Sequence, residues 1–268
     1  MNNVLFIGLG HMGSSLFKGV LKNKQIKANF YGYDTLKDLE EKVIKSVKGA
    51  HSLNNLEEIV SKNINYIIFA VRPIDFDKVC QNLKSLDLTN KTIISMVNAI
   101  EIEEIKLRFE KQKNLKIIRI MPNMNASIQK SVTAIAYNKA AKDELDFVIK
   151  MFESCGIVEV IEEKNFATFT AISGCLPAYV FTFFKAITDY GIKNGIEKEK
   201  VFRIVEQSII GSINNAANSQ MELKEMIKSI CVPNGSTIEG QKVLQDYNFE
   251  EIIKKCLQQA DKYSKPIK

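Results

Sequence analysis

Three glycines near the N-terminus have the spacing of a phosphate-binding turn. Gly8, Gly10 and Gly13 follow the pattern G-x-G-x-x-G, after the uncharged apolar run 4–7 and before apolar residues at helical spacing. In such a strand–turn–helix the first glycine permits the sharp turn. The second lets a pyrophosphate approach the backbone, and the third lets the helix pack against the sheet. The helix N-terminus attracts phosphate through its free N–H groups and partial positive charge.

We therefore predict that this turn binds a dinucleotide, the alternative being an ordinary tight turn between a strand and a helix. The residues predicted to bind it are Gly8, Leu9, Gly10, His11, Met12 and Gly13. Asp34 follows the next predicted strand, 28–33. A carboxylate there typically bonds the adenosine ribose hydroxyls and repels a 2′-phosphate, so Asp34 favours NAD(H) over NADP(H). The alternative is that Asp34 or Thr35 caps the helix predicted over 35–47.

A second helix N-terminus with chemical potential lies in the C-terminal part, at residues 231–237. Asn234 and Gly235 predict a turn, and Ser236 is a good N-cap for the helix that follows. Free N–H groups and the hydroxyls of Ser236 and Thr237 suit a carboxylate ligand. Simple helix capping is the alternative.

Strands and helices must alternate along the chain if the glycine turn and Asp34 are to lie in one binding site. Apolar runs at 4–7, 28–33, 64–71, 92–97 and 116–121 predict buried strands, and residues 131–137 and 157–160 predict two more around a helix at 142–153. The alternation predicts an α/β fold, a Rossmann-like parallel sheet with helices on both faces. Ligands bind beyond the carboxyl ends of such strands. The ends expected to face one crevice are residues 8–13, Asp34, residues 70–73, Asn98 and residues 122–123.

The periodicity becomes helical throughout from about residue 165. We predict a dinucleotide-binding domain over residues 1–162 and an all-helical domain over 163–268. The predicted helices are 166–172, 178–192, 197–218, 222–230, 236–247 and 248–263. The stretch 178–184 is apolar nearly all round, so either a partner chain or the domain's own core must cover it.

Composition narrows the classes of protein and the compartment. The net charge of +6 comes from scattered lysines with no basic stripe, which disfavours nucleic acid as a partner. Five separated cysteines without a C-x-x-C pair favour a reducing compartment, and two histidines are too few for a typical metal site, so we expect no metal. The N-terminal run lacks a basic segment, and the uncharged stretch 165–184 is interrupted by Gly174 and Pro177. We expect a soluble cytoplasmic protein without a signal peptide or a membrane span.

Motifs along nearly the whole chain resemble the pyrroline-5-carboxylate reductase family. They are FIGLGHMG at 6–13, AVRP at 70–73, RIMPN at 119–123, SGCLPAYVF at 173–181 and PNGSTI at 233–238. The first motif is common to many dehydrogenases, whereas the combination of the last three is specific. The resemblance implies an N-terminal Rossmann domain and a helical domain that interlocks with a second subunit, giving a homodimer or a larger assembly of dimers.

The activity that the resemblance implies is NAD(P)H-dependent reduction of 1-pyrroline-5-carboxylate to L-proline, the last step of proline biosynthesis. We expect NADH to be favoured, because of Asp34. Thr237 would donate a hydrogen bond to the ring nitrogen as the catalytic residue. By the same resemblance, the substrate carboxylate would bind at Val232, Asn234, Gly235, Ser236 and Thr237, and the cofactor would also contact Ala70, Val71, Arg72, Pro73 and Asn123.

The chain departs from the family pattern at the substrate end. The family usually has Ser-Pro-Gly-Gly where this chain has VPNG at 232–235, and Leu176 is bulkier than the family's residue. Val232 lacks a hydroxyl that would contact the carboxylate. Two alternatives follow, a relative that reduces a different imine or carbonyl compound, and a dimeric paralogue that binds a dinucleotide without catalysis. An imine accepts hydride readily once its nitrogen is protonated or firmly hydrogen-bonded, so the reaction needs no histidine acid.

Overall fold

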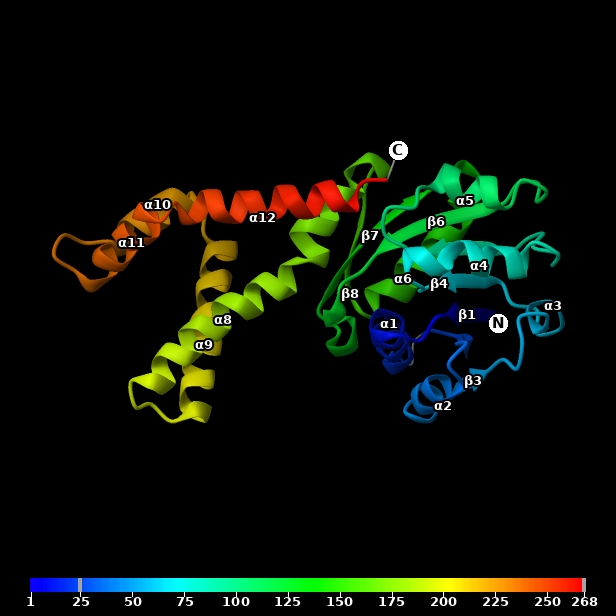
Figure 1. Cartoon of the computed structure of the whole chain (residues 1–268), viewed down its shortest axis with the longest axis horizontal. Helices are drawn as coiled ribbons and strands as arrows, with labels where there is room; N and C mark the ends of the chain where they lie inside the picture. The colour runs from blue at the N-terminus through cyan, green and yellow to red at the C-terminus, as the bar shows by residue number, and fades with distance from the viewer. Residues whose placement is uncertain (24–25, 267–268) are drawn as a thin grey trace. The chain divides into compact units, whose positions relative to one another are not determined.

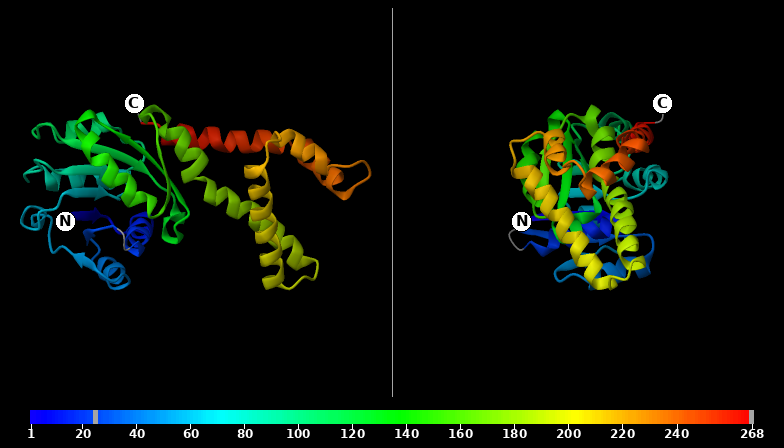
Figure 2. Two further views of the ribbon diagram at one scale, coloured as in Figure 1. Left: turned by 180° about the vertical axis from the view of Figure 1, so that it is seen from behind. Right: turned by 90° about the vertical axis from the view of Figure 1, so that its left-hand side faces the viewer.

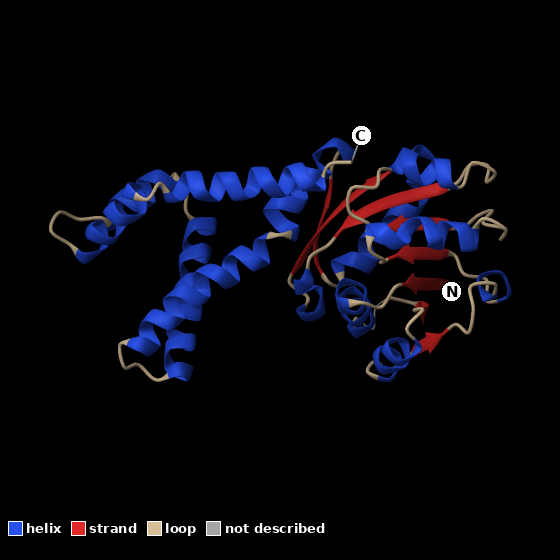
Figure 3. Cartoon of the chain, in the orientation of Figure 1, coloured by secondary structure: helices blue, strands red, loops and turns tan. Residues whose placement is uncertain are grey.

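The computed structural model describes residues 1–23 and 26–266, which divide into two compact units. The first unit contains residues 1–175 and the residues from Ala260 onward, and the second is Leu176–Gln259. Within the described residues, strands occur only in the first unit (Figure 3). Compact units and domains need not coincide, so the domain boundary after residue 162 stays a prediction.

In the described residues of the first unit, eight strands form one sheet in the order β3-β2-β1-β4-β5-β6-β7-β8 (Figure 1). Their bounds are β1 Asn2–Ile7, β2 Ala28–Tyr33, β3 Ala50–Ser52, β4 Tyr66–Phe69, β5 Thr92–Ser95, β6 Lys116–Met121, β7 Ser131–Tyr137 and β8 Gly156–Val160. The first six strands run parallel, as the alternation of strands and helices predicts. The chain leaves β1 toward β2 and β3 and returns to β4, so the strand order reverses between β1 and β4, where ligands bind in sheets of this kind.

The sheet is not parallel throughout, because the two strands at one edge run opposite to the other six. β7 runs antiparallel to β6, and β8 runs parallel to β7. Only residues 122–130 connect β6 to β7, including the 3₁₀ helix η1, Met124–Ile128. A parallel crossover needs a dozen or more residues, so this connection reverses the direction of the chain.

Helices cover both faces of the sheet. The helices of this unit are α1 His11–Lys22, α2 Lys37–Lys45, α3 Glu58–Ser61, α4 Pro73–Leu83, α5 Ile102–Arg108, η2 Lys139–Glu144, α6 Leu145–Glu153, η3 Glu163–Asn165, α7 Phe166–Phe169 and the π-helix η4 Thr170–Gly174. Figure 1 shows α4 and α5 in front of the sheet, and the view from behind in Figure 2 shows α6 on the opposite face.

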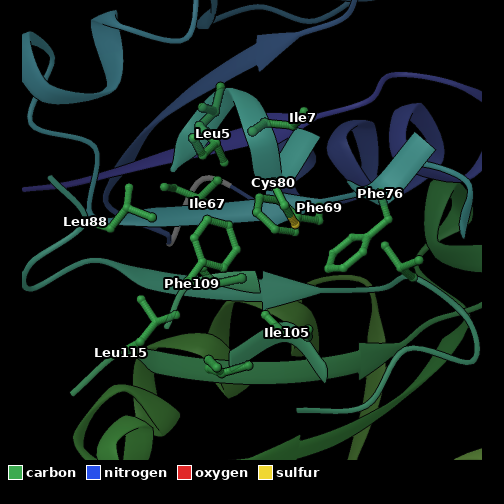
Figure 4. Packing of buried hydrophobic residues seen from close by; sticks show 14 of the residues in the cluster. Leu5, Ile7, Ile67, Phe69, Phe76, Cys80, Leu88, Ile105, Phe109 and Leu115 are labelled. Atoms are coloured by element: carbon green, nitrogen blue, oxygen red, sulfur yellow. The ribbon is translucent and has the colours of Figure 1, made fainter. Parts of the chain in front are cut away.

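The core is two apolar layers because side chains alternate along each strand. Leu5 and Ile7 of β1 pack with α3, α4 and α5, where Phe69 and Phe76 meet edge to face (Figure 4). Val4 and Phe6 pack on the other face with α1, α2 and α6. The central strands are buried on both faces, which is why they appear in the sequence as continuous apolar runs.

The second unit is helical and buries few side chains. Its helices are α8 Leu176–Lys193, α9 Lys198–Asn218, α10 Leu223–Ile230, α11 Ser236–Asp246 and α12 Phe249–Ser264, the last of which extends into the first unit. Helices α8 and α9 pack through the rings of Phe184 and Phe202, whose centroids are 4.6 Å apart. Phe181 and Phe183 are 55% and 48% exposed, so the unit's own core does not cover the apolar stretch 178–184.

Candidate active site

A cavity of about 870 Å³ lies at the carboxyl ends of the parallel strands in the first unit. Residues after β1, β2, β4, β5 and β6 line it, so the five predicted strand ends share one crevice. The lining residues singled out from the sequence are Gly8, Gly10, His11, Met12, Asp34, Ala70, Val71, Arg72, Pro73, Asn98, Pro122 and Asn123. The volume falls in the range of small-molecule and cofactor sites.

The glycine turn forms one wall of this cavity, with Gly8 and Gly10 lining it and Gly13 behind them. Gly8 has φ +95°, a left-handed conformation that favours glycine, and its N–H donates to the carbonyl of Tyr33 over 2.8 Å. A Cβ on Gly13 would lie 2.1 Å from the carbonyl oxygen of Gly8, so only glycine fits where α1 meets the turn. A Cβ on Gly10 would meet no atom within 4 Å, and Gly10 faces the cavity. The backbone at Gly10 is therefore open to a ligand.

Two helices begin at the cavity wall. Helix α1 starts after Gly10 with no side-chain cap and no acidic residue in its first turn. Helix α4 starts after Arg72, also without a side-chain cap, and Pro73 occupies its first turn. Helix N-termini attract anions, and Arg72 adds a positive charge. A hydrogen bond and the charge of Asp75 raise the pKa of Arg72 further, so this charge persists at any physiological pH.

Asp34 joins the glycine turn to the loop after β2. Its Oδ2 accepts a hydrogen bond from the N–H of Leu9 over 2.7 Å, and its Oδ1 accepts from the N–H of Leu36 over 2.9 Å. Each carboxylate oxygen keeps acceptor capacity for a ligand hydroxyl. Helix α2 has Leu36 as its N-cap residue and no side-chain cap, so neither Asp34 nor Thr35 caps it.

The far end of the cavity is held by Asn123. This side chain is 6% exposed, and its Oδ1 accepts from the N–H of Asn125 over 3.1 Å. Its Nδ2 donates over 3.4 Å to the Ser173 hydroxyl and carbonyl, which lie in η4. The π-helical turn closes with the N–H of Cys175 donating to the carbonyl of Thr170 over 2.9 Å. Such turns often occur at functional sites.

Several predicted residues lie elsewhere. Leu9 is buried in the core and reaches the site only through its N–H bond to Asp34, and Gly13 supports the turn from behind. The predicted substrate residues, Val232, Asn234, Gly235, Ser236 and Thr237, belong to the second unit, whereas all residues lining this cavity belong to the first.

The substrate loop differs in detail from its prediction. Gly235, and not Ser236, is the N-cap residue of α11, which has no side-chain cap. Asn234 adopts φ +61°, and the N–H of Gly235 donates to the carbonyl of Val232 over 3.1 Å, which closes the predicted turn. Within this loop Val232, Asn234 and Ser236 face solvent, and Gly235 is partly exposed.

Part of the cavity lining was not predicted from the sequence. Thr170, Gly174 and Cys175 come from η4 and the residue after it, and Tyr33, Thr35 and Leu36 flank Asp34. Gly174 and Cys175 stand inside the motif at 173–181, which is the only sequence signal for them. Within residues 1–23 and 26–266, no group of three or more His, Cys, Asp or Glu side chains is arranged to hold a metal ion.

Together, the sheet, the glycine turn and the uncapped helix N-termini define a dinucleotide-dependent oxidoreductase. A family model described as "NADP oxidoreductase coenzyme F420-dependent" matches residues 3–99, and one described as "Pyrroline-5-carboxylate reductase dimerisation" matches residues 163–267. The chain belongs to the pyrroline-5-carboxylate reductase family. It is an NAD(P)H-dependent oxidoreductase that forms a homo-oligomer and acts on a small molecule.

Full-length relatives support this assignment. The chain is 30% identical to the pyrroline-5-carboxylate reductase of Staphylococcus aureus strain COL over 96% of this chain and 94% of the relative. It is 29% identical to that of Aquifex aeolicus, over 97% and 96%. A solved Streptococcus pyogenes 1-pyrroline-5-carboxylate reductase superposes with a TM-score of 0.88 at 29% identity, covering 98% of each chain. A Plasmodium falciparum pyrroline carboxylate reductase with NADP bound gives 0.85 at 28% identity, also over 98% of each chain.

Proposed function

We infer that this protein reduces 1-pyrroline-5-carboxylate to L-proline with NAD(P)H. The observation that carries this inference is the match to pyrroline-5-carboxylate reductases along nearly the whole of both chains. The first unit supplies a cavity suited to a dinucleotide. The second supplies a turn and an uncapped helix N-terminus suited to a small carboxylate.

The residues of the first unit fit a nicotinamide dinucleotide. The open backbone at Gly10 and the N-terminus of α1 would receive the pyrophosphate. The reduced nicotinamide supplies a hydride when the cofactor is bound. Asp34 would accept hydrogen bonds from the adenosine ribose, and its negative charge disfavours a 2′-phosphate. We therefore propose that NADH is preferred to NADPH.

The second unit would hold the substrate. The backbone N–H groups at the start of α11 would bind the carboxylate, and the Thr237 hydroxyl would donate a hydrogen bond to the ring nitrogen. Holding the imine in line for hydride at C5 is most of the catalytic task, and alignment of two reactants contributes ~7–11 kcal/mol. Hydride addition at C5 leaves the C=N electron pair on the ring nitrogen, and a proton taken up there completes the reduction to an amine.

The assay that tests this function follows absorbance at 340 nm with 1-pyrroline-5-carboxylate and either NADH or NADPH, together with amino-acid analysis for proline. We expect proline to form in amounts equal to the cofactor oxidised, with a higher kcat/KM for NADH. Cofactor binding without turnover would contradict the proposed reaction. A strong preference for NADPH would contradict the role of Asp34.

Thr237→Ala and Thr237→Ser test the proposed donor. Thr237→Ala removes the hydroxyl, so kcat should fall about 10- to 100-fold, the worth of one hydrogen bond to a charged group. Thr237→Ser keeps a hydroxyl and should retain most of the activity. Equal activity in the wild type and Thr237→Ala would remove Thr237 from the mechanism.

A second candidate is reduction of another imine or carbonyl compound, which Val232 favours. Its side chain is apolar and 56% exposed at the position where the family usually has serine. A substrate with a less polar group at this position would gain from Val232, whereas a carboxylate would lose one hydroxyl contact. Comparing kcat/KM for 1-pyrroline-5-carboxylate and for 1-pyrroline, which lacks the carboxylate, decides between them.

We also propose a cytoplasmic homodimer, or a larger assembly of dimers, with neither nucleic acid nor a membrane as partner. All five cysteines are free, which supports a reducing compartment. One helical run in the described residues, Glu163–Lys193, is long and apolar enough to span a membrane by length and composition alone, with 33% of its apolar window buried. The dimerisation match covers this run, so we assign its apolar surface to a partner chain.

A further inference from the structure

A buried carboxylate stands behind Asp34 and has no part in the function proposed so far. Glu40, in α2, is 3% exposed and does not line the cavity. Its Oε2 accepts a hydrogen bond from the backbone N–H of Asp34 over 2.9 Å, and its Oε1 accepts from the Ser52 hydroxyl of β3. Glu40 therefore fixes the backbone of Asp34 against the edge of the sheet.

Glu40 also holds a cation close to the same wall. The Lys37 ammonium lies 2.8 Å from Oε2 of Glu40 and 4.4 Å from the centre of the Tyr33 ring, and Tyr33 lines the cavity beside Asp34. The Lys37 side chain is 54% exposed and has the reach and flexibility to turn toward a ligand. Its charge is engaged by Glu40 and by the ring face, and it also donates to the carbonyl of Leu53 over 3.5 Å.

We propose that Glu40 is a positioning residue that sets the preference for NADH over NADPH. It acts in two ways, by keeping the Asp34 carboxylate at the cavity wall and by withholding the Lys37 ammonium from the place where a 2′-phosphate would lie. This inference rests on the proposed use of a nicotinamide dinucleotide. Asp34, Lys37 and Glu40 would then determine together whether NADH or NADPH binds better. Of these three residues, only Asp34 would contact the ligand.

Glu40→Gln separates the two actions. The amide oxygen of the substituted side chain still accepts from the N–H of Asp34, but the neutral group no longer forms an ion pair with Lys37. Dissociation constants for NADH and NADPH are measured by fluorescence titration, without substrate. We expect the preference for NADH to fall roughly tenfold, the effect of one added charged hydrogen bond to the 2′-phosphate.

The double variant Glu40→Gln/Lys37→Met tests the route of the effect. A methionine in place of Lys37 keeps the apolar packing over Tyr33 without a charge, so the preference for NADH should return to within about twofold of the wild type. Lys37→Met alone should leave it unchanged, because Lys37 is already engaged by Glu40. Glu41→Gln, which removes the same charge from the exposed face of α2, is the matched control and should also leave it unchanged.

Three outcomes would overturn the role of Glu40. They are an unchanged ratio of the two dissociation constants in Glu40→Gln, an equal weakening of both cofactors, and a loss of NADPH binding in Lys37→Met alone. A wild type that binds neither dinucleotide contradicts the proposed function instead. The circular dichroism spectrum of each variant separates loss of fold from loss of selectivity, and Lys37→Met keeps the proposal testable if Glu40→Gln does not fold.

Discussion

Glycines of one motif serve two different physical purposes in this chain. Gly13 is fixed by packing, since a Cβ would lie 2.1 Å from the Gly8 oxygen. Gly10 is fixed by nothing inside the protein, since its Cβ direction is open and faces the cavity. Ligand binding therefore requires a glycine at position 10, whereas packing within the fold requires one at position 13.

We predict that Gly13→Ala lowers stability, whereas Gly10→Ala weakens cofactor binding. Gly13→Ala should destabilise the protein by about 1–3 kcal/mol, because the backbone must shift to relieve the contact. Gly10→Ala should leave the melting temperature unchanged and weaken NADH binding at least tenfold, because the methyl group occupies the approach of the pyrophosphate. Thermal unfolding without ligand and titration with NADH measure the two effects separately. Normal NADH affinity in Gly10→Ala would contradict the placement of the pyrophosphate.

Strands and their ends were predictable because burial on both faces leaves a clear pattern. The apolar runs 4–7 and 64–71 predicted the two central strands, and the residues after the observed strand ends at Ile7 and Phe69 line the cavity. The reversal at β7 was not predicted, although residues 122–130 between the two predicted strands are too few for a parallel crossover. The π-helical turn at Thr170–Gly174 looks in sequence like any helical segment, so its part in the lining was missed. The N-cap residue of α11 was displaced by one position because Ser and Gly both suit that place.

Three polar residues hold elements together at the beginnings of the strands, away from the cavity. Glu144, at the end of η2, accepts a hydrogen bond over 2.5 Å from the Tyr66 hydroxyl of β4 and pairs with Lys116 of β6. Partial burial raises the pKa of Glu144, but the hydrogen bonds from Lys116 and Tyr66 and the charge of Lys116 outweigh it, so the pKa is lowered overall. Burial, followed by the Glu144 hydrogen bond, raises the pKa of Tyr66, which keeps the phenol a donor.

We predict that Glu144→Gln destabilises the protein by about 1–2 kcal/mol at pH 7 and by less in acid. The folded-state pKa lies below the unfolded one, so the stabilisation is complete above the unfolded pKa and is lost as the pH falls through the folded value. Urea unfolding at fixed protein concentration, at pH 7 and at pH 4 and below, measures the difference from the wild type. A difference that grows toward low pH would contradict this assignment. Glu41→Gln, which breaks an exposed pair with Lys45, should show no change at either pH.

The second unit leaves much of its own apolar surface exposed. Phe181, Phe183 and Ile213 are about half exposed or more, and large contiguous apolar surface on a folded chain marks an interface. In the sequence, the stretch 178–184 is apolar nearly all round, which predicts a covered helix. It does not show whether a partner chain or the domain's own core covers it. We propose that a second copy of the chain covers it, which the dimerisation match over residues 163–267 supports.

We predict that Phe181→Asp disrupts the assembly. A carboxylate on this apolar face would be desolvated without a partner on association, so the homo-oligomer should dissociate at micromolar concentration. Analytical ultracentrifugation measures the change in mass. Tyr190→Asp, at a side chain 71% exposed on the same helix, tests how far the interface extends along α8. An oligomer of unchanged mass in Phe181→Asp would exclude this face from the interface.

The most direct test of the account follows the transferred hydrogen itself. NADH carrying deuterium at C4 of its nicotinamide, in the transferred position, is incubated with the wild type and 1-pyrroline-5-carboxylate, and the product is analysed by mass spectrometry and NMR. We expect L-proline with one deuterium at C5, formed in step with NADH oxidation, and much less of it with Thr237→Ala. Oxidation of NADH that leaves proline without deuterium at C5, or yields no proline, would contradict it.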